Sequence, residues 1–355
     1  MNEIKYIGMD VHQASTSIVV LNAAGRVLTS ALVETQGQAL VAFIQGQHGT
    51  LHLTFEEGTY AAWLYDLLAP HVSRIVVCDP RHNALLKAGS KNDPIDAHKL
   101  AELLRVNALR PVYHGQNSLG TLKELSRSYL CLVQDSTRVM NRLKALYRSR
   151  GVPCGGTEVY SPSHRTSWVD QLKEAGVHQR AQLLYQHLDL LGRLRREAKG
   201  ALLAESRKHS LSRILRPVPG LGLVRIAVLL AMVQTPFRFR SKRLFWAYVG
   251  LGLVTRISAE FALVNGQLQR SGKAPTIRGL NPNHQRELKE IFKSAASAAV
   301  RRPGPWQQFY QRRVEAGRKP ELVRLTVARK LAAVTLHLWK KGERYDVKHL
   351  KSTAV

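Results

Sequence analysis

The sequence predicts an α/β domain with a mixed sheet at the N-terminus, a helical middle part and a mainly helical C-terminal part. Short β-branched apolar runs alternate with helical patterns in the N-terminal part. Beyond residue 116 the apolar residues keep helical spacing, and a Pro-Gly-x-Gly turn separates two such helical parts. We therefore expect domains at 1–115, 116–210 and 211–345, followed by a tail at 346–355.

The N-terminal domain is expected to begin with three strands, at residues 4–10, 15–22 and 26–33, because β-branched runs flank the turn sequence Asn22-Ala23-Ala24-Gly25. The elements expected next are a helix near 37–46, a strand at 51–56, a helix near 61–68, a strand at 74–78, a helix from Asp79-Pro80 to about Ala88 and a helix from 93 to about Leu109. Three strands followed by alternating helices and strands give a mixed sheet, and this order is the layout of ribonuclease H-like domains.

The middle part carries two long stretches of apolar residues at helical spacing. The first includes Leu122, Leu125 and Tyr129, and the second runs from Leu183 to Leu203. A Gly- and Pro-rich break over residues 151–163 separates them. This pattern predicts two helices that form an antiparallel pair or a coiled-coil arm.

The C-terminal part begins with Pro219-Gly220-Leu221-Gly222, directly before an apolar helix. This segment resembles the hairpin of helix-hairpin-helix modules, in which the backbone N–H groups of Gly220 and Gly222 would help to hold a phosphate at a helix N-terminus. A glycine turn between two buried helices explains the segment equally well. The basic residues expected to contact nucleic acid after it are Arg238, Arg240, Lys242 and Arg243. Ser241, among them, is expected to cap a helix.

Charge is distributed unevenly along the chain. The net charge is +28, yet residues 1–110 contain nine Lys and Arg against ten Asp and Glu, which leaves 44 against 15 for the rest. So basic a chain is expected to bind polyanions. The predicted partners are therefore nucleic acids, held mainly by the part of the chain beyond residue 110.

Several classes of protein are not favoured by the sequence. No apolar run reaches the roughly 18–20 residues that span a bilayer, so no membrane partner is expected. Asn2-Glu3-Ile4-Lys5 leads into a strand pattern instead of a signal peptide. Cys78, Cys131 and Cys154 have neither metal-site spacing nor a disulfide framework. We therefore expect a cytoplasmic protein.

Four acidic residues coincide with the ends of expected elements: Asp10 and Glu56 close two strands, and Asp93 and Asp96 begin a helix. Carboxylates in these places can converge on one point, where they repel one another unless cations hold them. Oxygen ligands of this kind suit Mg²⁺. Two such ions about 3.5–4 Å apart can activate the attacking oxygen and stabilise the leaving oxygen in phosphodiester cleavage. The acids therefore predict a metal site that acts on nucleic acid.

Structural interpretations of the same acids remain open at this point. Asp93-Pro94 is a common N-cap and N1 pair, which puts Asp96 at N3, where the helix dipole favours a negative charge. Asp10 can simply begin a turn. The capping interpretation explains each acid by itself, but it does not explain why all four coincide with element ends in one domain.

Two neighbours of these acids need assignment. Glu57 competes with Glu56, because alternation along a strand puts the two on opposite faces and only one can join the cluster. His12, two residues after Asp10, is expected at the surface or beside the substrate instead of acting as a ligand.

Taken together, these motifs resemble the DEDD transposases of the IS110 insertion-sequence family, which are related to the Piv DNA invertase. Gly8-Met9-Asp10-Val11-His12 is similar to the opening motif of the family. Phe55-Glu56-Glu57-Gly58 is similar to its Tyr-Glu-Ala-Gly block, which selects Glu56 over Glu57. Lys91-Asn92-Asp93-Pro94-Ile95-Asp96-Ala97 is similar to its Lys-x-Asp-x-x-Asp-Ala block. The resemblance implies a RuvC-like catalytic domain in which the four acids bind Mg²⁺, or Mn²⁺ in its place.

The C-terminal part also resembles this family, through Pro219-Gly220-Leu221-Gly222 and Phe239-Arg240-Ser241. Laying Tyr248-Val249-Gly250-Leu251 on the family's Tyr-Leu-Gly-Leu segment puts Ser258 at the position of a nucleophilic serine. The sequence departs from the family pattern here, because no glycine follows Ser258. Ser271-Gly272 keeps the expected Ser-Gly pair but lies further downstream.

The function expected from all of these features is that of a DNA transposase, a site-specific recombinase that mobilises an insertion sequence through metal-bound acids and a serine nucleophile. The resemblance also implies donor and target DNA as substrates, an element-encoded bridge RNA as a guide, and assembly into homodimers and tetramers. Two alternatives stay open: a metal-dependent Holliday-junction-type nuclease that uses water, and a non-catalytic nucleic-acid-binding protein.

Overall fold

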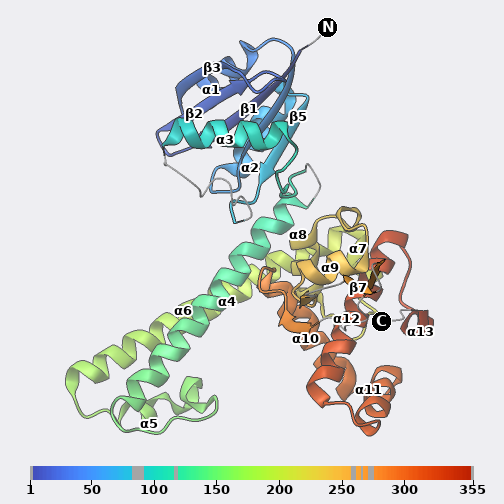
Figure 1. Ribbon diagram of the computed structural model, residues 1–355. Coiled ribbons are helices and arrows are strands. Elements are labelled where there is room, and N and C mark those ends of the chain that lie inside the picture. The colour runs from blue at the N-terminus through green and yellow to red at the C-terminus, as the bar shows by residue number, and fades with distance from the viewer. Residues whose placement is uncertain are drawn as a thin grey trace. The chain divides into compact units, whose positions relative to one another are not determined.

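A computed structural model describes residues 3–81, 92–115, 119–256, 261–264, 267–270 and 276–352 (Figure 1). The chain divides into two compact units, Met1–Gln116 and Asn117–Val355. The expected division into three domains and a tail stays a prediction. Among the described residues, none of the helices combines the length and the apolar character that crossing a bilayer requires.

The first unit is built on a five-stranded mixed sheet. Its strands are β1 (Ile4–Val11), β2 (Ser15–Leu21), β3 (Val27–Glu34), β4 (Thr50–Glu56) and β5 (Arg74–Cys78). They lie in the order β3-β2-β1-β4-β5. The first three strands pair antiparallel, whereas β4 pairs parallel with both β1 and β5. The predicted mixed sheet is confirmed, and the arrangement is that of a ribonuclease H-like domain.

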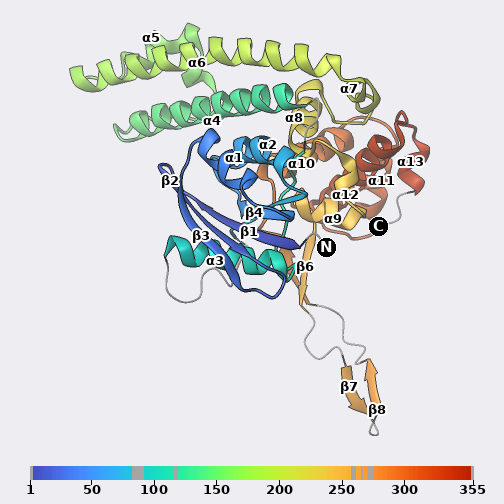
Figure 2. The ribbon, with the colours of Figure 1, turned by 90° about the horizontal axis from the view of Figure 1, so that it is seen from above.

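Helices cover both faces of this sheet (Figure 2). Helices α1 (Gly37–Gln45) and α2 (Ala61–Leu68) lie on one face, where they cover Ile7, Met9 and Phe55. Helix α3 (Asp93–Arg105) lies on the other face, and its Ala97 and Ala101 pack against Val19 and Leu21 of β2. The sheet is therefore the middle layer of three.

Of two further helices expected in this unit, one cannot be compared over most of its length and the other ends earlier than expected. Most of the helix expected from Asp79 to Ala88 lies outside the described residues; the described start is a turn in which the Asp79 carboxylate accepts from Arg81 N at 3.0 Å. Helix α3 ends at Arg105, earlier than the expected residue 109. The reason is that Asn107 adopts a φ of +54°, in the left-handed region that ends helices.

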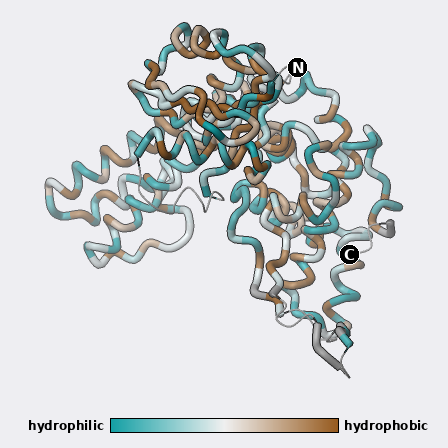
Figure 3. The backbone as a smooth tube through the Cα atoms, turned by 45° about the horizontal axis from the view of Figure 1, so that its top comes forward, coloured by the Kyte–Doolittle hydropathy of each residue, from teal (hydrophilic) through white to brown (hydrophobic). Residues whose placement is uncertain are grey.

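The second unit begins with the predicted antiparallel pair of long helices, α4 (Gly120–Arg148) and α6 (Ala175–Lys208), which lie side by side in Figures 1 and 2. In Figure 3 polar and apolar residues alternate along them. The connection contains the 3₁₀ turns η3 (Glu158–Tyr160) and η4 (Pro162–His164) and helix α5 (Arg165–Val169). This connection forms the tip of the helical arm. Tyr147 and Tyr185, whose hydroxyl oxygens are 3.1 Å apart, belong to a separate hydrophobic core at the tip.

The rest of the second unit is mainly helical, as predicted. Its helical elements are α7 (Ser210–Leu215), α8 (Leu223–Val233), the 3₁₀ turn η5 (Pro236–Arg238), α9 (Lys242–Tyr248), α10 (Arg286–Arg301), α11 (Pro305–Glu315), α12 (Pro320–Lys341) and α13 (Lys348–Ser352). Helices α8, α10 and α12 supply most of one hydrophobic core, which Leu122 of α4 and Leu202 of α6 also enter. The base of the arm is therefore fixed in the C-terminal core.

Two short antiparallel ribbons were not among the sequence predictions. Strand β6 (Leu253–Arg256) pairs with β9 (Thr276–Leu280), and β7 (Phe261–Val264) pairs with β8 (Gln267–Arg270). They occupy the part of the chain that contains both candidate serines, Ser258 and Ser271, which themselves lie outside the described residues.

Candidate active site

A very close approach between β1 and α3 positions the site. Gly8 of β1 faces the helix, and a Cβ atom added there would lie 2.1 Å from the carbonyl oxygen of Ala97 and 2.5 Å from the backbone nitrogen of Ala101. Both alanines are fully buried. Only glycine on the strand and small residues on the helix allow this contact. It brings the start of α3 over the carboxyl end of β1, where Asp10 lies.

The pairing of β1 with β4 positions Glu56. The last paired residues in this parallel register are Met9 and Phe55, which are both fully buried beneath α1 and α2. The next residue on each strand, Asp10 or Glu56, points to the opposite face, because side chains alternate along a strand. Asp10 and Glu56 therefore project from neighbouring strand ends on the face that α3 covers.

Glu57 lies on the opposite face of the sheet from Glu56. Its carboxylate lies 2.6 Å from Nε2 of His114, and the His114 ring stacks at 5.3 Å from that of Tyr65 in α2. This contact agrees with the prediction that Glu57 is not part of the cluster, although the role of Glu56 stays a prediction.

Three side chains form the centre of the cluster. Nε2 of His12 lies 3.2 Å from Oδ2 of Asp10 and 3.6 Å from Oδ1 of Asp93. One ligand atom from each of the three can be chosen so that all lie within 4.8 Å of one another, which is close enough for a metal ion. Asp96 follows one turn into α3, and Nζ of Lys99 lies 3.4 Å from its Oδ1.

The electrostatics of Asp10 reflect its neighbours. Burial raises the pKa of its carboxyl above the ordinary value, the ring of His12 lowers it, and the carboxylates of Asp93 and Asp96 raise it. Three of the four acids thus act on one another through space. A cation would relieve this repulsion, and the carboxylate oxygens fit a divalent cation such as Mg²⁺ or Mn²⁺.

The assignment of Asp93 as an N-cap is wrong, although Asp93 and Asp96 both lie in the first turn of α3, where the helix dipole favours a negative charge. Asn92 is the N-cap residue of α3, Asp93 and Pro94 are its first two residues, and the N-cap side chain makes no capping hydrogen bond. Asp96 is therefore the fourth helical residue, and its N–H already donates to the carbonyl oxygen of Asn92 at 3.0 Å. The Asp93 carboxylate is directed to His12.

Two models of known families match separate parts of the chain. A model of DEDD transposases of IS110 elements matches residues 7–149, and a model described as "Transposase IS116/IS110/IS902 family" matches residues 212–311. The chain belongs to the IS110 family of transposases. The resemblance inferred from the motifs is thereby confirmed. No curated protein matches the transposase. Membership implies DNA as the substrate, with DNA cleavage and strand transfer as the general activity.

The two glycines of the hairpin-like segment differ in their surroundings. Gly220 has a φ of +79°, and a Cβ atom there would lie 2.2 Å from the carbonyl oxygen of Ala295 in α10. Its own carbonyl oxygen accepts from Arg225 at 2.7 Å. Gly222, at the N-cap of α8, has open space where a Cβ would be. Close packing and a positive φ explain why residue 220 of the transposase is a glycine, and phosphate binding at Gly220 and Gly222 stays a prediction.

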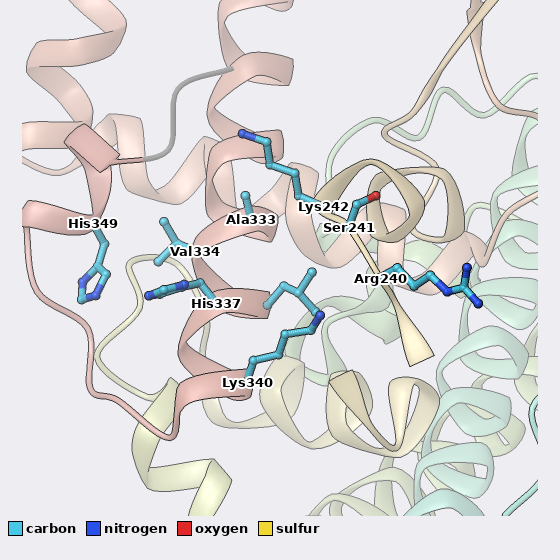
Figure 4. Close-up of a pocket in the computed structure, with 9 residues that line it drawn as sticks. Arg240, Ser241, Lys242, Ala333, Val334, His337, Lys340 and His349 are labelled. Carbon is cyan, nitrogen blue, oxygen red and sulfur yellow. The ribbon is translucent and has the colours of Figure 1, made fainter. Parts of the chain in front are cut away.

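The four basic candidates in the C-terminal part occupy different surroundings. The guanidinium of Arg238 lies 4.8 Å from the ring centre of Tyr248, and Nζ of Lys242 lies 5.6 Å from that of Trp246. Arg240 and Lys242 also line a cavity of about 310 Å³ but extend in different directions (Figure 4). Arg243 is exposed. Their contact with nucleic acid stays a prediction.

The capping role of Ser241 is confirmed, since its Oγ accepts from Leu244 N at 3.4 Å.

Sequence reasoning considered His12 but did not expect its contact with the acids, and it overlooked Lys99. The exposed His12 contacts Asp10 and Asp93, and its spacing of two from Asp10 was a signal for this contact, because residues two apart in extended chain share a face. Lys99 follows Asp96 at a spacing of three, which makes helical side chains neighbours.

Proposed function

We propose that this transposase moves its insertion sequence by metal-dependent cleavage of DNA at the cluster of Asp10, Glu56, Asp93 and Asp96. The contact of one imidazole with carboxylates from β1 and from α3 supports this proposal most directly. The tight packing at Gly8 supports it further, because a fixed helix start gives the acids a fixed spacing.

The four acids would hold Mg²⁺ or Mn²⁺, which when bound supplies positive charge next to the reacting phosphate. The protein's own contribution is orientation. His12 holds the Asp10 carboxylate by a 3.2 Å hydrogen bond, and the Lys99 ammonium holds Asp96. Both contacts restrict rotation of a carboxylate that would otherwise turn away from its neighbours.

The strand-transfer step in this proposal uses Ser258. Its Oγ loses a proton and attacks the phosphorus of a DNA strand, so that a phosphoserine bond forms, a P–O bond of DNA breaks and a DNA hydroxyl leaves with a proton. The hydroxyl of a second strand then attacks the phosphoserine and releases the serine. The bond energy is conserved, so no nucleotide cofactor is needed. Ser271 is the alternative nucleophile.

The proposed partners are donor and target DNA together with an element-encoded bridge RNA that pairs with both. The excess of Lys and Arg beyond residue 110, 44 against 15 acids, supports contact with more than one nucleic acid strand. Assembly into dimers and tetramers, which would bring several strands together, also belongs to this proposal.

Trapping of a covalent adduct tests the chemistry. Purified protein is incubated with end-labelled element DNA, target DNA, Mg²⁺ and RNA transcribed from the flanking non-coding region, and then denatured. We expect a protein–DNA adduct that disappears in Ser258→Ala and in Asp93→Asn. Ser128→Ala, at an exposed serine of α4, and Asp66→Asn, at an exposed acid of α2, are the matched controls.

Each other outcome selects an alternative. Loss of the adduct in Ser271→Ala but not in Ser258→Ala would move the nucleophile to Ser271. Cleavage that requires Asp93 but produces no adduct would indicate a junction nuclease that uses water. DNA binding without cleavage under any of these conditions would indicate a non-catalytic protein, and equal recombination without RNA would remove the guide from the proposal.

A further inference from the structure

Helix α12 exposes one histidine within an otherwise buried stretch. Every residue from Lys330 to Trp339 is buried except His337. Its ring lies next to that of His349, which α13 supplies, with ring centres 5.6 Å apart (Figure 4). Neither histidine is part of the hydrophobic core, so packing of the core does not explain why the two polar rings lie next to each other.

A carboxylate joins the two rings. Glu343 follows Gly342, the left-handed residue that ends α12 with a φ of +69°. Its Oε2 lies 3.8 Å from Nε2 of His337 and 3.8 Å from Nε2 of His349. The three ligand atoms all lie within 4.8 Å of one another. Residues at equal spacings of six along the chain thus meet at one point.

The second ring nitrogen of His349 is held by the backbone. The backbone N–H of Asp346 donates to Nδ1 at 3.0 Å, and the carbonyl oxygen of the same residue lies 2.9 Å from Nδ1. Metal binding at Nε2 requires the tautomer in which Nδ1 donates to that carbonyl oxygen. Metal-binding histidines usually have such a backbone or carboxylate partner on the second nitrogen.

Contacts outside the cluster hold its chain segment in place. Trp306 Nε1 donates to the hydroxyl oxygen of Tyr345 at 2.8 Å, between the two C-terminal ligands. The side chain of Leu350 enters the hydrophobic core, and its carbonyl oxygen accepts from Lys330 at 3.4 Å. Because these contacts already order the segment, binding of an ion would cost little additional conformational entropy of the chain.

We propose that His337, Glu343 and His349 bind a transition-metal ion, with Zn²⁺ as the best fit, and that this ion fastens α13 to the end of α12. Two imidazoles and one carboxylate are a common zinc set, and water fills the fourth position. Zinc bonds of about 2.0–2.1 Å put tetrahedral ligand atoms roughly 3.4 Å apart. The observed 3.8 Å separations therefore need only small side-chain movements.

The basic surroundings do not prevent binding of a cation. Lys340, which follows His337 by three residues and lines the same cavity, donates to the carbonyl oxygen of Phe239 at 2.6 Å and is held there. The carboxylate of Glu343 supplies a negative charge within the cluster itself. Two imidazoles complete the set, which differs from the carboxylate-rich cluster around Asp10 and therefore prefers a softer ion.

Metal binding to the full-length transposase tests the proposal. All proteins carry Asp10→Asn and His12→Gln, so that the acidic cluster does not compete for the ion. We measure zinc per chain after dialysis, and the visible absorption of the Co²⁺-loaded protein. The expected result is one tightly held ion with the spectrum of tetrahedral Co²⁺. His337→Ala and Glu343→Gln should each weaken binding at least tenfold, whereas His187→Ala, at an exposed histidine of α6, should not change it.

Hydrogen exchange provides a second measurement. Zn²⁺ should slow amide exchange in residues 343–352, a chelator should reverse the effect, and His337→Ala should abolish it. The proposal is overturned if no stoichiometric ion is held, or if His337→Ala retains both the ion and the protection. Because His337 and Glu343 are both exposed, their substitution leaves the hydrophobic core intact.

Discussion

Substitution of Gly8 by alanine should push α3 away from the sheet. The added Cβ would lie 2.1 Å from Ala97 O and 2.5 Å from Ala101 N, and both are backbone atoms that no side-chain rotation can move. The helix must therefore shift by about 1 Å to reach ordinary contact. Overpacking of this kind costs about 1–3 kcal/mol. A displacement of about 1 Å at reacting groups lowers activity roughly 100-fold.

Two assays check these magnitudes. Amide exchange in α3 should accelerate roughly five- to 150-fold in Gly8→Ala, since each 1.4 kcal/mol corresponds to a factor of ten. Metal-dependent DNA cleavage should fall by about two orders of magnitude. Gly46→Ala is the control in the same unit, because its Cβ would meet nothing nearer than 3.5 Å. Wild-type exchange and cleavage in Gly8→Ala would refute the argument that this contact sets the position of the acids.

Three other perturbations have defined outcomes. Asp93→Asn should lower cleavage at least 100-fold while DNA binding, measured by gel shift, stays within twofold; an equal loss of both would contradict the assignment. Lys99→Met removes the ammonium that holds Asp96 at 3.4 Å and should raise the Mg²⁺ concentration needed for half-maximal cleavage by up to about fivefold, the effect of a partly exposed ion pair; a decrease would show that Lys99 competes with the metal for Asp96 instead of orienting it. Tyr185→Phe deletes a hydroxyl that donates to Val159 O at 2.9 Å and should destabilise the arm tip by about 1–2 kcal/mol, measured by hydrogen exchange, while exchange in α12 stays unchanged.

The sheet of the first unit was predictable because its signals are local. The β-branched runs and the turn at Asn22–Gly25 predict the first three strands to within a residue or two of their observed bounds. The meeting of Asp10 with Asp93 was predictable only as a coincidence of element ends. Its cause, the contact of Gly8 with Ala97, joins residues 89 positions apart and has no local signal.

The failures are mostly at boundaries, where several residues compete for one role. Asn92 is as good an N-cap as Asp93, and the structure uses Asn92. Asn107 was an available signal for the end of α3, because asparagine tolerates a positive φ. Strands β7 and β8 are only four residues long, too short for a periodicity. The Asn265-Gly266 pair between them is nevertheless a strong hairpin signature.

The two cores of the arm allow its length to vary independently of its ends. One core surrounds Tyr147 and Tyr185 at the tip, and the other encloses Leu122 and Leu202 at the base. Removal of seven residues from α4 and seven facing residues from α6 would preserve the side-chain repeat and shorten the arm by about 10 Å, at 1.5 Å per residue. The reach of the tip can thus be changed by whole heptads without redesigning either core.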